Sequence, residues 1–228
     1  MKNFNLLSTC LLFAVSSAAS HAAVLIDFGD AAGETAGYVN INNPGAANTG
    51  SGSIGSTTYD LIDFTTTTDT GWNLNISNFQ GDAGTGANYT GTKPAGLSGY
   101  ADTALNDGFF GANGSGATLS FSNLAASTAY KFIIYSARGN NGTDAIFNFT
   151  TGTGTGGTIS NVFNNSTEFL TLTGTSTAGG LLTLTWSSTN VSNNSSALNF
   201  ISMEQVPEPS SVALLGLGAM GLALRRRR

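Results

Sequence analysis

Residues 121–139 read FSNLAASTAYKFIIYSARG, and this stretch decides the fold that the sequence predicts. Its second half, Tyr130–Ser136, is rich in aromatic and β-branched residues, which favours a β-strand. Leu124, Thr128 and Tyr130 have the spacing L-x-x-x-T-x-Y, in which a tyrosine hydroxyl bonds back to the upstream backbone where the chain passes between two sheets. The stretch therefore predicts an arch in a β-sandwich.

Similar short runs recur along the rest of the chain, separated by clusters of glycine, asparagine and threonine. Trp72, Leu74 and Ile76 alternate with polar residues, and the run Leu182–Trp186 does the same, so each set shares one face of a strand. Both tryptophans are therefore interpreted as core residues. The predicted strands are Val24–Phe28, Tyr38–Ile41, Tyr59–Phe64, Trp72–Phe79, Thr118–Phe121, Tyr130–Ser136, Ala145–Thr150, Thr158–Phe163, Glu168–Thr173, Leu181–Trp186 and Ala197–Met203.

This pattern predicts an all-β fold, a single antiparallel β-sandwich with a jelly-roll-like arrangement. Helical periodicity is nearly absent between the two ends of the chain. From Gly81 to Gly116 glycines are dense and the strand pattern weakens. We interpret this segment as long loops at one end of the sandwich, where binding sites on such folds tend to lie.

The composition excludes several classes of function. Residues 23–205 contain three basic and twelve acidic residues, a net charge of −9, which disfavours nucleic acid as a partner. The single cysteine, Cys10, and the single histidine, His21, both precede this segment. It therefore has no means of forming a Ser–His–Asp or Cys–His catalytic site, a zinc site with nitrogen or sulfur ligands, or a disulfide.

The N-terminus has the features of a secretory signal peptide. Lys2 supplies a positive charge, Leu6–Val15 is largely apolar, and Ser20-His21-Ala22 places small residues at the positions that a signal peptidase reads. We predict a signal peptide over residues 1–22, with cleavage after Ala22. The protein is therefore expected to be secreted.

The C-terminus carries a short apolar segment that ends in arginines. Residues 212–224 lack charge; as a helix they would span roughly 20 Å at 1.5 Å per residue, less than the hydrocarbon core of a bilayer, about 30 Å. A guanidinium costs about 2.5 kcal/mol or more at the bilayer centre, so the arginines keep the C-terminus on the cytoplasmic side. We predict a transient anchor in the inner membrane. The stop residues are Arg225, Arg226, Arg227 and Arg228.

Pro207, Glu208 and Pro209, followed by this apolar segment and the arginines, resemble the PEP-CTERM sorting signal of exopolysaccharide-producing Gram-negative bacteria. The resemblance covers residues 206–228. It implies cleavage near the Pro-Glu-Pro motif by an exosortase, a membrane transpeptidase-like protease, and delivery to the cell surface or extracellular matrix. The expected organisation is a signal peptide (1–22), a sandwich domain (23–205) and a sorting signal (206–228).

No catalytic residue is predicted in the sandwich. A polysaccharide site would use an aromatic ring to stack on a sugar and polar groups to take the hydroxyls. The spacing of Leu124, Thr128 and Tyr130 resembles that of fibronectin type III-like sandwiches, and also that of the galactose-binding-like jelly rolls often found in PEP-CTERM proteins. No cofactor is expected except a structural calcium ion, for which Asp27, Asp30 and Glu34, or Asn106 and Asp107, offer oxygen ligands. The candidate ligand-binding residues are Tyr89, Tyr100, Asp107 and Arg138.

Two short motifs are interpreted as structural. Asp69-Thr70-Gly71 matches the aspartic protease triplet but occurs once, and that chemistry needs two aspartates. Gly152, Gly154 and Gly157 have G-x-G-x-x-G spacing, but a strand rather than a helix is expected next.

The predicted function is a non-enzymatic surface or matrix protein that binds exopolysaccharide. A scaffold without a ligand and a glycoside hydrolase or lyase using only carboxylates remain the alternatives.

Overall fold

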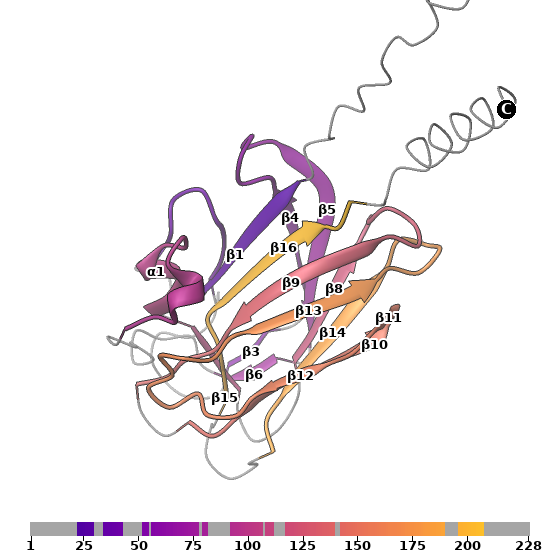
Figure 1. Cartoon of the computed structure of the whole chain (residues 1–228). Coiled ribbons are helices and arrows are strands. Elements are labelled where there is room, and N and C mark those ends of the chain that lie inside the picture. The colour runs from indigo at the N-terminus through magenta and orange to yellow at the C-terminus, as the bar shows by residue number, and fades with distance from the viewer. Residues whose placement is uncertain are drawn as a thin grey trace, which may run out of the picture. The chain divides into compact units, whose positions relative to one another are not determined.

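The computed structural model describes residues 22–29, 34–42, 52–54, 56–77, 79–81, 92–106, 108–111, 117–139, 142–189 and 196–207. Within these residues, two six-stranded sheets pack face to face (Figure 1). The first sheet has the order β11 (Thr153–Gly154), β13 (Leu170–Thr175), β9 (Ala129–Tyr135), β16 (Phe200–Gln205), β1 (Ala23–Gly29) and β2 (Val39–Asn42). The second has the order β12 (Gly157–Ile159), β10 (Ala145–Thr151), β14 (Leu182–Ser187), β8 (Ala117–Ser122), β5 (Asp69–Ser77) and β4 (Thr57–Ile62).

The predicted all-β sandwich is confirmed, with one difference in strand direction. β2 runs parallel to β1, with Ile26 opposite Val39 and Gly29 opposite Asn42. β1 and β2 therefore begin at the same end of the sheet and do not form a hairpin. The expectation of antiparallel pairing throughout is wrong at this edge.

The arch predicted from residues 121–139 is present. β8 lies in the second sheet and β9 in the first, so the chain crosses the sandwich between them. The Ala125 amide donates a hydrogen bond of 2.8 Å to the Tyr130 hydroxyl. The buried Tyr130 ring meets Trp72 edge-on, with 5.3 Å between centroids. This confirms the tyrosine interpretation and ties the arch to the core.

The alternating strand faces also pack as predicted. Trp72, Leu74 and Ile76 are buried in the main core, as are Leu184 and Trp186. Trp186 is 1% exposed, and its indole N–H donates to the Ser196 hydroxyl at 2.6 Å. A buried indole needs such a partner because its N–H has lost water. Both tryptophans are therefore core residues.

The predicted strands differ most from the structure at three places. Trp72–Phe79 ends at Ser77, and Phe79 belongs to a separate strand, β6 (Phe79–Gly81). Ala197–Met203 is divided at Asn199 into β15 (Ser196–Leu198) and β16, and the Asn199 side chain accepts a 2.7 Å hydrogen bond from the Ala137 amide. β15 pairs instead with β7 (Phe109–Gly111). The strand predicted at Thr158–Phe163 ends at Ile159, because the next amide, that of Ser160, donates to the Glu168 carboxylate at 2.9 Å.

The segment from Gly81 to Gly116 is more structured than predicted. It contains the end of β6 (Phe79–Gly81), which pairs with β3 (Gly52–Ile54), and also η2 (Ala95–Leu97), α1 (Asp102–Asn106) and β7. Leu97 and Leu105 join a second apolar cluster with Leu25, Tyr135 and Phe200, which lie on the outer face of the first sheet. The two short helices therefore cover that face. Figure 1 shows α1 beside β1.

The outer face of the second sheet carries many uncharged polar residues, together with the exposed Asp60 of β4. One row across four strands consists of Thr58, Asn75, Ser120 and Thr183. The Asn75 amide donates to the Thr58 hydroxyl at 3.0 Å, and the hydroxyls of Ser120 and Thr183 lie 3.3 Å apart. The neighbouring row consists of Ser77, Thr118, Thr185 and Asn148.

The segments predicted for targeting lie largely outside the described residues. These are the signal peptide apart from Ala22, the membrane helix at 212–224 and the sorting motif beyond Pro207. In the part of the chain that the structure describes, no helix is long and apolar enough to cross a membrane. Ala22–Val206 forms one compact unit.

Candidate functional site

Tyr100 sits between the two short helices, on the outer face of the first sheet. Its ring packs on Phe200 of β16, with 4.6 Å between ring centroids and a tilt of 50°. The residue remains half-buried, so part of its surface is open to solvent. The segment that contains η2, Tyr100 and α1 is anchored by Leu97 and Leu105, which are buried against the same sheet. The buried Phe200 ring thus supports the Tyr100 ring at the surface.

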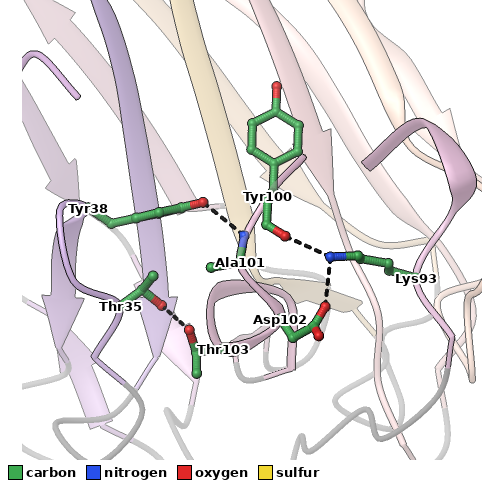
Figure 2. Close-up of polar contacts among 7 residues, drawn as sticks. All are labelled: Thr35, Tyr38, Lys93, Tyr100, Ala101, Asp102 and Thr103. Carbon is green, nitrogen blue, oxygen red and sulfur yellow. Dashed lines mark hydrogen bonds and ion pairs between the residues drawn. The ribbon is translucent and has the colours of Figure 1, made fainter. Parts of the chain in front are cut away.

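Lys93 holds this segment together by two contacts (Figure 2). Its ammonium group donates to the Tyr100 carbonyl oxygen at 2.7 Å and pairs with an Asp102 carboxylate oxygen at 2.8 Å. The Lys93 side chain is 26% exposed and that of Asp102 is 73% exposed. Such a pair contributes little stability in high dielectric. Its effect is to place a cation and an anion beside the Tyr100 backbone.

Tyr38 brings a second aromatic ring to the same region. Its hydroxyl accepts a 3.1 Å hydrogen bond from the Ala101 amide, the residue after Tyr100 (Figure 2). Its ring contacts Phe64 edge-on, with centroids 5.7 Å apart, and Phe200, with centroids 6.0 Å apart. Burial raises the pKa of the Tyr38 hydroxyl, so it stays protonated at neutral pH. Phe200 thus supports two half-exposed tyrosines.

Asp27 lies on the same face of β1 as Leu25 and is 2% exposed. One carboxylate oxygen accepts a hydrogen bond of 3.1 Å from the Thr35 amide, and the other is buried without a hydrogen-bond partner. Burial raises the pKa of Asp27 to about 6, against the lowering effect of the Thr35 bonds. The Thr35 and Thr103 hydroxyls lie 2.7 Å apart and join this region to α1 (Figure 2).

We call the surface formed by Tyr38, Lys93, Tyr100 and Asp102 the tyrosine site. It offers two aromatic rings, an ammonium group and a largely exposed carboxylate. Aromatic rings with a few adjacent polar groups are the groups by which proteins hold sugars and other hydroxyl-rich ligands.

The predicted ligand residues are only partly placed. Tyr100 belongs to the tyrosine site, whereas Tyr89 and Asp107 lie outside the described residues. Arg138 follows β9 and forms an isolated bridge with Phe163, and burial lowers the pKa of its guanidinium group. Sequence reasoning missed Tyr38 and Lys93, because Tyr38 was assigned to a strand and no pattern linked it to a segment about 60 residues away.

The described residues do not complete either predicted calcium site. Among them, no group of three or more histidine, cysteine or acidic side chains gathers to hold a metal ion. Asp30 and Asp107 lie outside the described residues. Of the remaining candidates, the Glu34 carboxylate accepts a 2.6 Å hydrogen bond from the side-chain amide of Asn42.

Two further carboxylates, the buried Asp144 and the exposed Asp69, have structural partners. Asp144 accepts hydrogen bonds from Ser188 at 2.7 Å and from the amide and hydroxyl of Thr189 at 3.0 and 2.7 Å. Burial tends to raise its pKa, but these bonds outweigh burial and lower the pKa. Asp69 accepts from the Gly71 amide at 2.8 Å, so the Asp-Thr-Gly triplet closes a local turn at the start of β5. The G-x-G-x-x-G stretch leads into β12, as expected.

Comparison with known proteins identifies the C-terminal tail. Residues 205–228 match the model of the PEP-CTERM protein-sorting motif, which confirms the resemblance seen in the sequence. Among solved structures, the chain is similar to "CBM35 from Cellvibrio japonicus Abf62", with 16% identity over 42% of this chain and 71% of that chain and a TM-score of 0.28. No curated protein sequence matches the chain.

Proposed function

We propose that the protein is exported, held briefly in the inner membrane by residues 212–224, and cut near Pro207-Glu208-Pro209 by an exosortase. The released sandwich domain then becomes a non-enzymatic component of the cell surface or extracellular matrix. The observation that carries this proposal is the sorting motif at residues 205–228. The short apolar segment and the terminal arginines support a transient anchor, because a longer segment would be needed to span the bilayer comfortably.

We further propose that the sandwich is jelly-roll-like and binds exopolysaccharide through the tyrosine site. Successive strands β8, β9 and β10 alternate between the two sheets, which supports the jelly-roll arrangement. Tyr38 and Tyr100 are held on a common aromatic support, Phe200. The polymer would stack on these rings and hydrogen-bond with Lys93 and Asp102. A net charge of −9 over residues 23–205 favours a neutral or weakly charged polymer over a polyanion.

Replacement of Pro207, Glu208 and Pro209 together by alanine should abolish sorting. The exosortase would no longer find its motif, so the protein should keep its tail and remain with the inner membrane. Fractionation and mass spectrometry of the producing bacterium measure both effects. Alanine replacement of Ser210 and Ser211, which follow the motif, is the matched control. Unchanged size and location after the motif replacement would refute the proposal.

Replacement of Tyr100 by alanine should weaken binding to the producer's exopolysaccharide by about two- to tenfold, because one aromatic stacking contact contributes about 0.5–1.5 kcal/mol. Tyr100→Phe keeps the ring and should retain most of the affinity. Phe163→Ala, which removes a 43% exposed ring elsewhere on the sandwich, is the control. Affinity electrophoresis with the purified polymer gives the comparison. Equal affinity of all variants would exclude the tyrosine site, and new reducing ends would indicate a hydrolase.

A further inference from the structure

The backbone N–H and C=O of Ala23, the first residue of β1, both form hydrogen bonds with the turn that joins β4 to β5. The Ala23 amide donates to the second carboxylate oxygen of Asp63, Oδ2, at 3.2 Å. The Ala23 carbonyl accepts a 2.7 Å hydrogen bond from the Phe64 amide. Ala23 is the residue that would become the N-terminus if a signal peptidase cut after Ala22. The turn therefore contacts the chain at the expected processing point.

The other Asp63 oxygen is already engaged within the turn. Oδ1 accepts from the Thr65 amide at 2.8 Å, from the Thr65 hydroxyl at 2.6 Å and from the Thr66 amide at 2.8 Å. The Asp63 amide itself donates to the Thr68 carbonyl at 2.9 Å. These bonds fix the carboxylate so that Oδ2 faces Ala23. The threonine run 65–68 thus orients the Asp63 carboxylate.

Asp63 is a buried anion without a cationic partner in the described part of the chain. It is 5% exposed. The described lysines pair elsewhere, Lys93 with Asp102 and Lys131 with Glu204, each at 2.8 Å. Burial tends to raise the pKa of Asp63, but the hydrogen bonds from Thr65 and Thr66 outweigh burial and lower the pKa. The carboxylate is therefore ionised at neutral pH, beside a backbone nitrogen.

We propose that Asp63 is the binding site for the α-ammonium group of the mature chain. The inference rests on the export step of the proposed function. Hydrolysis of the Ala22–Ala23 peptide bond consumes one water: its hydroxyl goes to the Ala22 carbonyl carbon, and the released Ala23 nitrogen takes up protons to become an ammonium group. A neutral amide donor is thereby replaced by a cation at the same place, opposite an ionised and largely buried carboxylate.

The exchange strengthens the contact because a hydrogen bond between two ionised groups is shorter and roughly twice as strong as one between neutral groups. It also removes the cost of a buried charge without a counter-ion. The mature chain is consequently more stable than a chain that continues upstream of Ala23. Removal of the signal peptide therefore creates an ion pair between the new N-terminus and Asp63 at the start of β1.

A double-mutant cycle on the exported full-length protein tests this site. One change inserts Gly-Ser between Ala22 and Ala23, so that cleavage after Ala22 leaves the ammonium group two residues away. The other change is Asp63→Asn. In the wild-type background, the insertion should lower Tm by about 2 to 4 °C, the shift that corresponds to about 1 kcal/mol in a domain of this size. In the Asp63→Asn background, the same insertion should leave Tm unchanged.

Asp144→Asn is the matched control, since Asp144 is also a buried carboxylate held by hydroxyl and amide donors and contacts no expected chain end. The insertion should lower Tm equally in that background and in the wild type. A second readout does not require the Asp63 variant to fold. At neutral pH, an acylating reagent should modify the wild-type α-amine more slowly than that of the insertion variant, by about tenfold for each unit by which Asp63 raises its pKa.

Mass spectrometry of the mature N-terminus separates two kinds of failure. A chain that still begins at Met1 would refute the export step, and the Asp63 site with it, whereas a chain cut at a residue other than Ala22 would refute the Asp63 site and leave export standing. A chain that begins at Ala23, with equal insertion effects in the wild-type and Asp63→Asn backgrounds and equal acylation rates, would refute the Asp63 site alone. The sorting proposal would then stand on the localisation experiment.

Discussion

Replacing Tyr130 by alanine should lower the free energy of unfolding by about 3–5 kcal/mol, the usual cost of truncating a large buried aromatic residue. The ring is fully buried and lies edge-on to Trp72, so the change opens a cavity between the two sheets. It also removes the acceptor for the Ala125 amide. Urea unfolding followed by tryptophan fluorescence measures the loss, because Trp72 reports directly on this contact.

Two further variants divide this loss into its parts. Tyr130→Phe keeps the ring and removes only the hydroxyl that closes the arch, so it should cost about 1 kcal/mol. Phe163→Ala removes a ring that is 43% exposed and should change stability by less than about 0.5 kcal/mol. If Tyr130→Phe destabilised the protein as much as Tyr130→Ala, the ring's packing would not be the main source of stability at the arch.

Asp27 should make the sandwich less stable at pH 7 than at pH 4, and Asp27→Asn should remove this loss. Burial raises the pKa of Asp27 from 3.8 to about 6, a difference that corresponds to about 3 kcal/mol. Below pH 3.8 the carboxyl is protonated in the folded and the unfolded chain alike. Between pH 3.8 and about 6 the unfolded chain loses the proton first, so the free energy of unfolding falls as pH rises.

Urea unfolding of both proteins between pH 4 and 7 measures the difference. The Asp27→Asn variant should be more stable than the wild type at pH 7, by up to about 3 kcal/mol. The two proteins should converge near pH 4. Asp60→Asn, at an exposed position of β4, is the control and should leave the pH dependence of the wild type unchanged. Equal pH dependence of wild type and Asp27→Asn would contradict the assignment.

The same experiment tests the calcium prediction. If Asp27, Asp30 and Glu34 hold the ion, added calcium should stabilise the wild type at pH 7 and should not stabilise Asp27→Asn. Calcium would then supply the positive charge that the buried carboxylate lacks among the described side chains. Equal calcium responses of the two proteins would exclude Asp27 as a ligand.

The features that were predicted correctly have local patterns in the sequence. The tyrosine arch depends on residues within six positions of one another, Ala125 and Tyr130 among them. Strand β5 alternates between buried and partly exposed residues from Trp72 onward, and its period of two is visible in the sequence without knowledge of the partners. The sorting motif is likewise a contiguous stretch, which is why residues 206–228 were identified from their spacing and agree with the match at residues 205–228.

The features that were missed depend on contacts between distant residues. α1 has five residues, too few to show a helical period, and it is positioned by the outer face of the first sheet. A predicted strand is divided at Asn199, whose side chain bonds to an amide 62 residues away. The tyrosine site was found only in part because Tyr38 and Ala101 meet across 63 residues of sequence. No pattern within either segment indicates that contact.

The rows of threonine, serine and asparagine on the outer face of the second sheet affect how this face is hydrated at different salt concentrations. Their hydration depends on hydroxyl and amide groups, whose hydrogen bonds to water are not weakened by dissolved ions as charge–charge attractions are. That face should therefore keep its water shell in both dilute and saline media. It gives the protein a side on which most of the surface groups are hydroxyls and amides, with Asp60 as a charged exception.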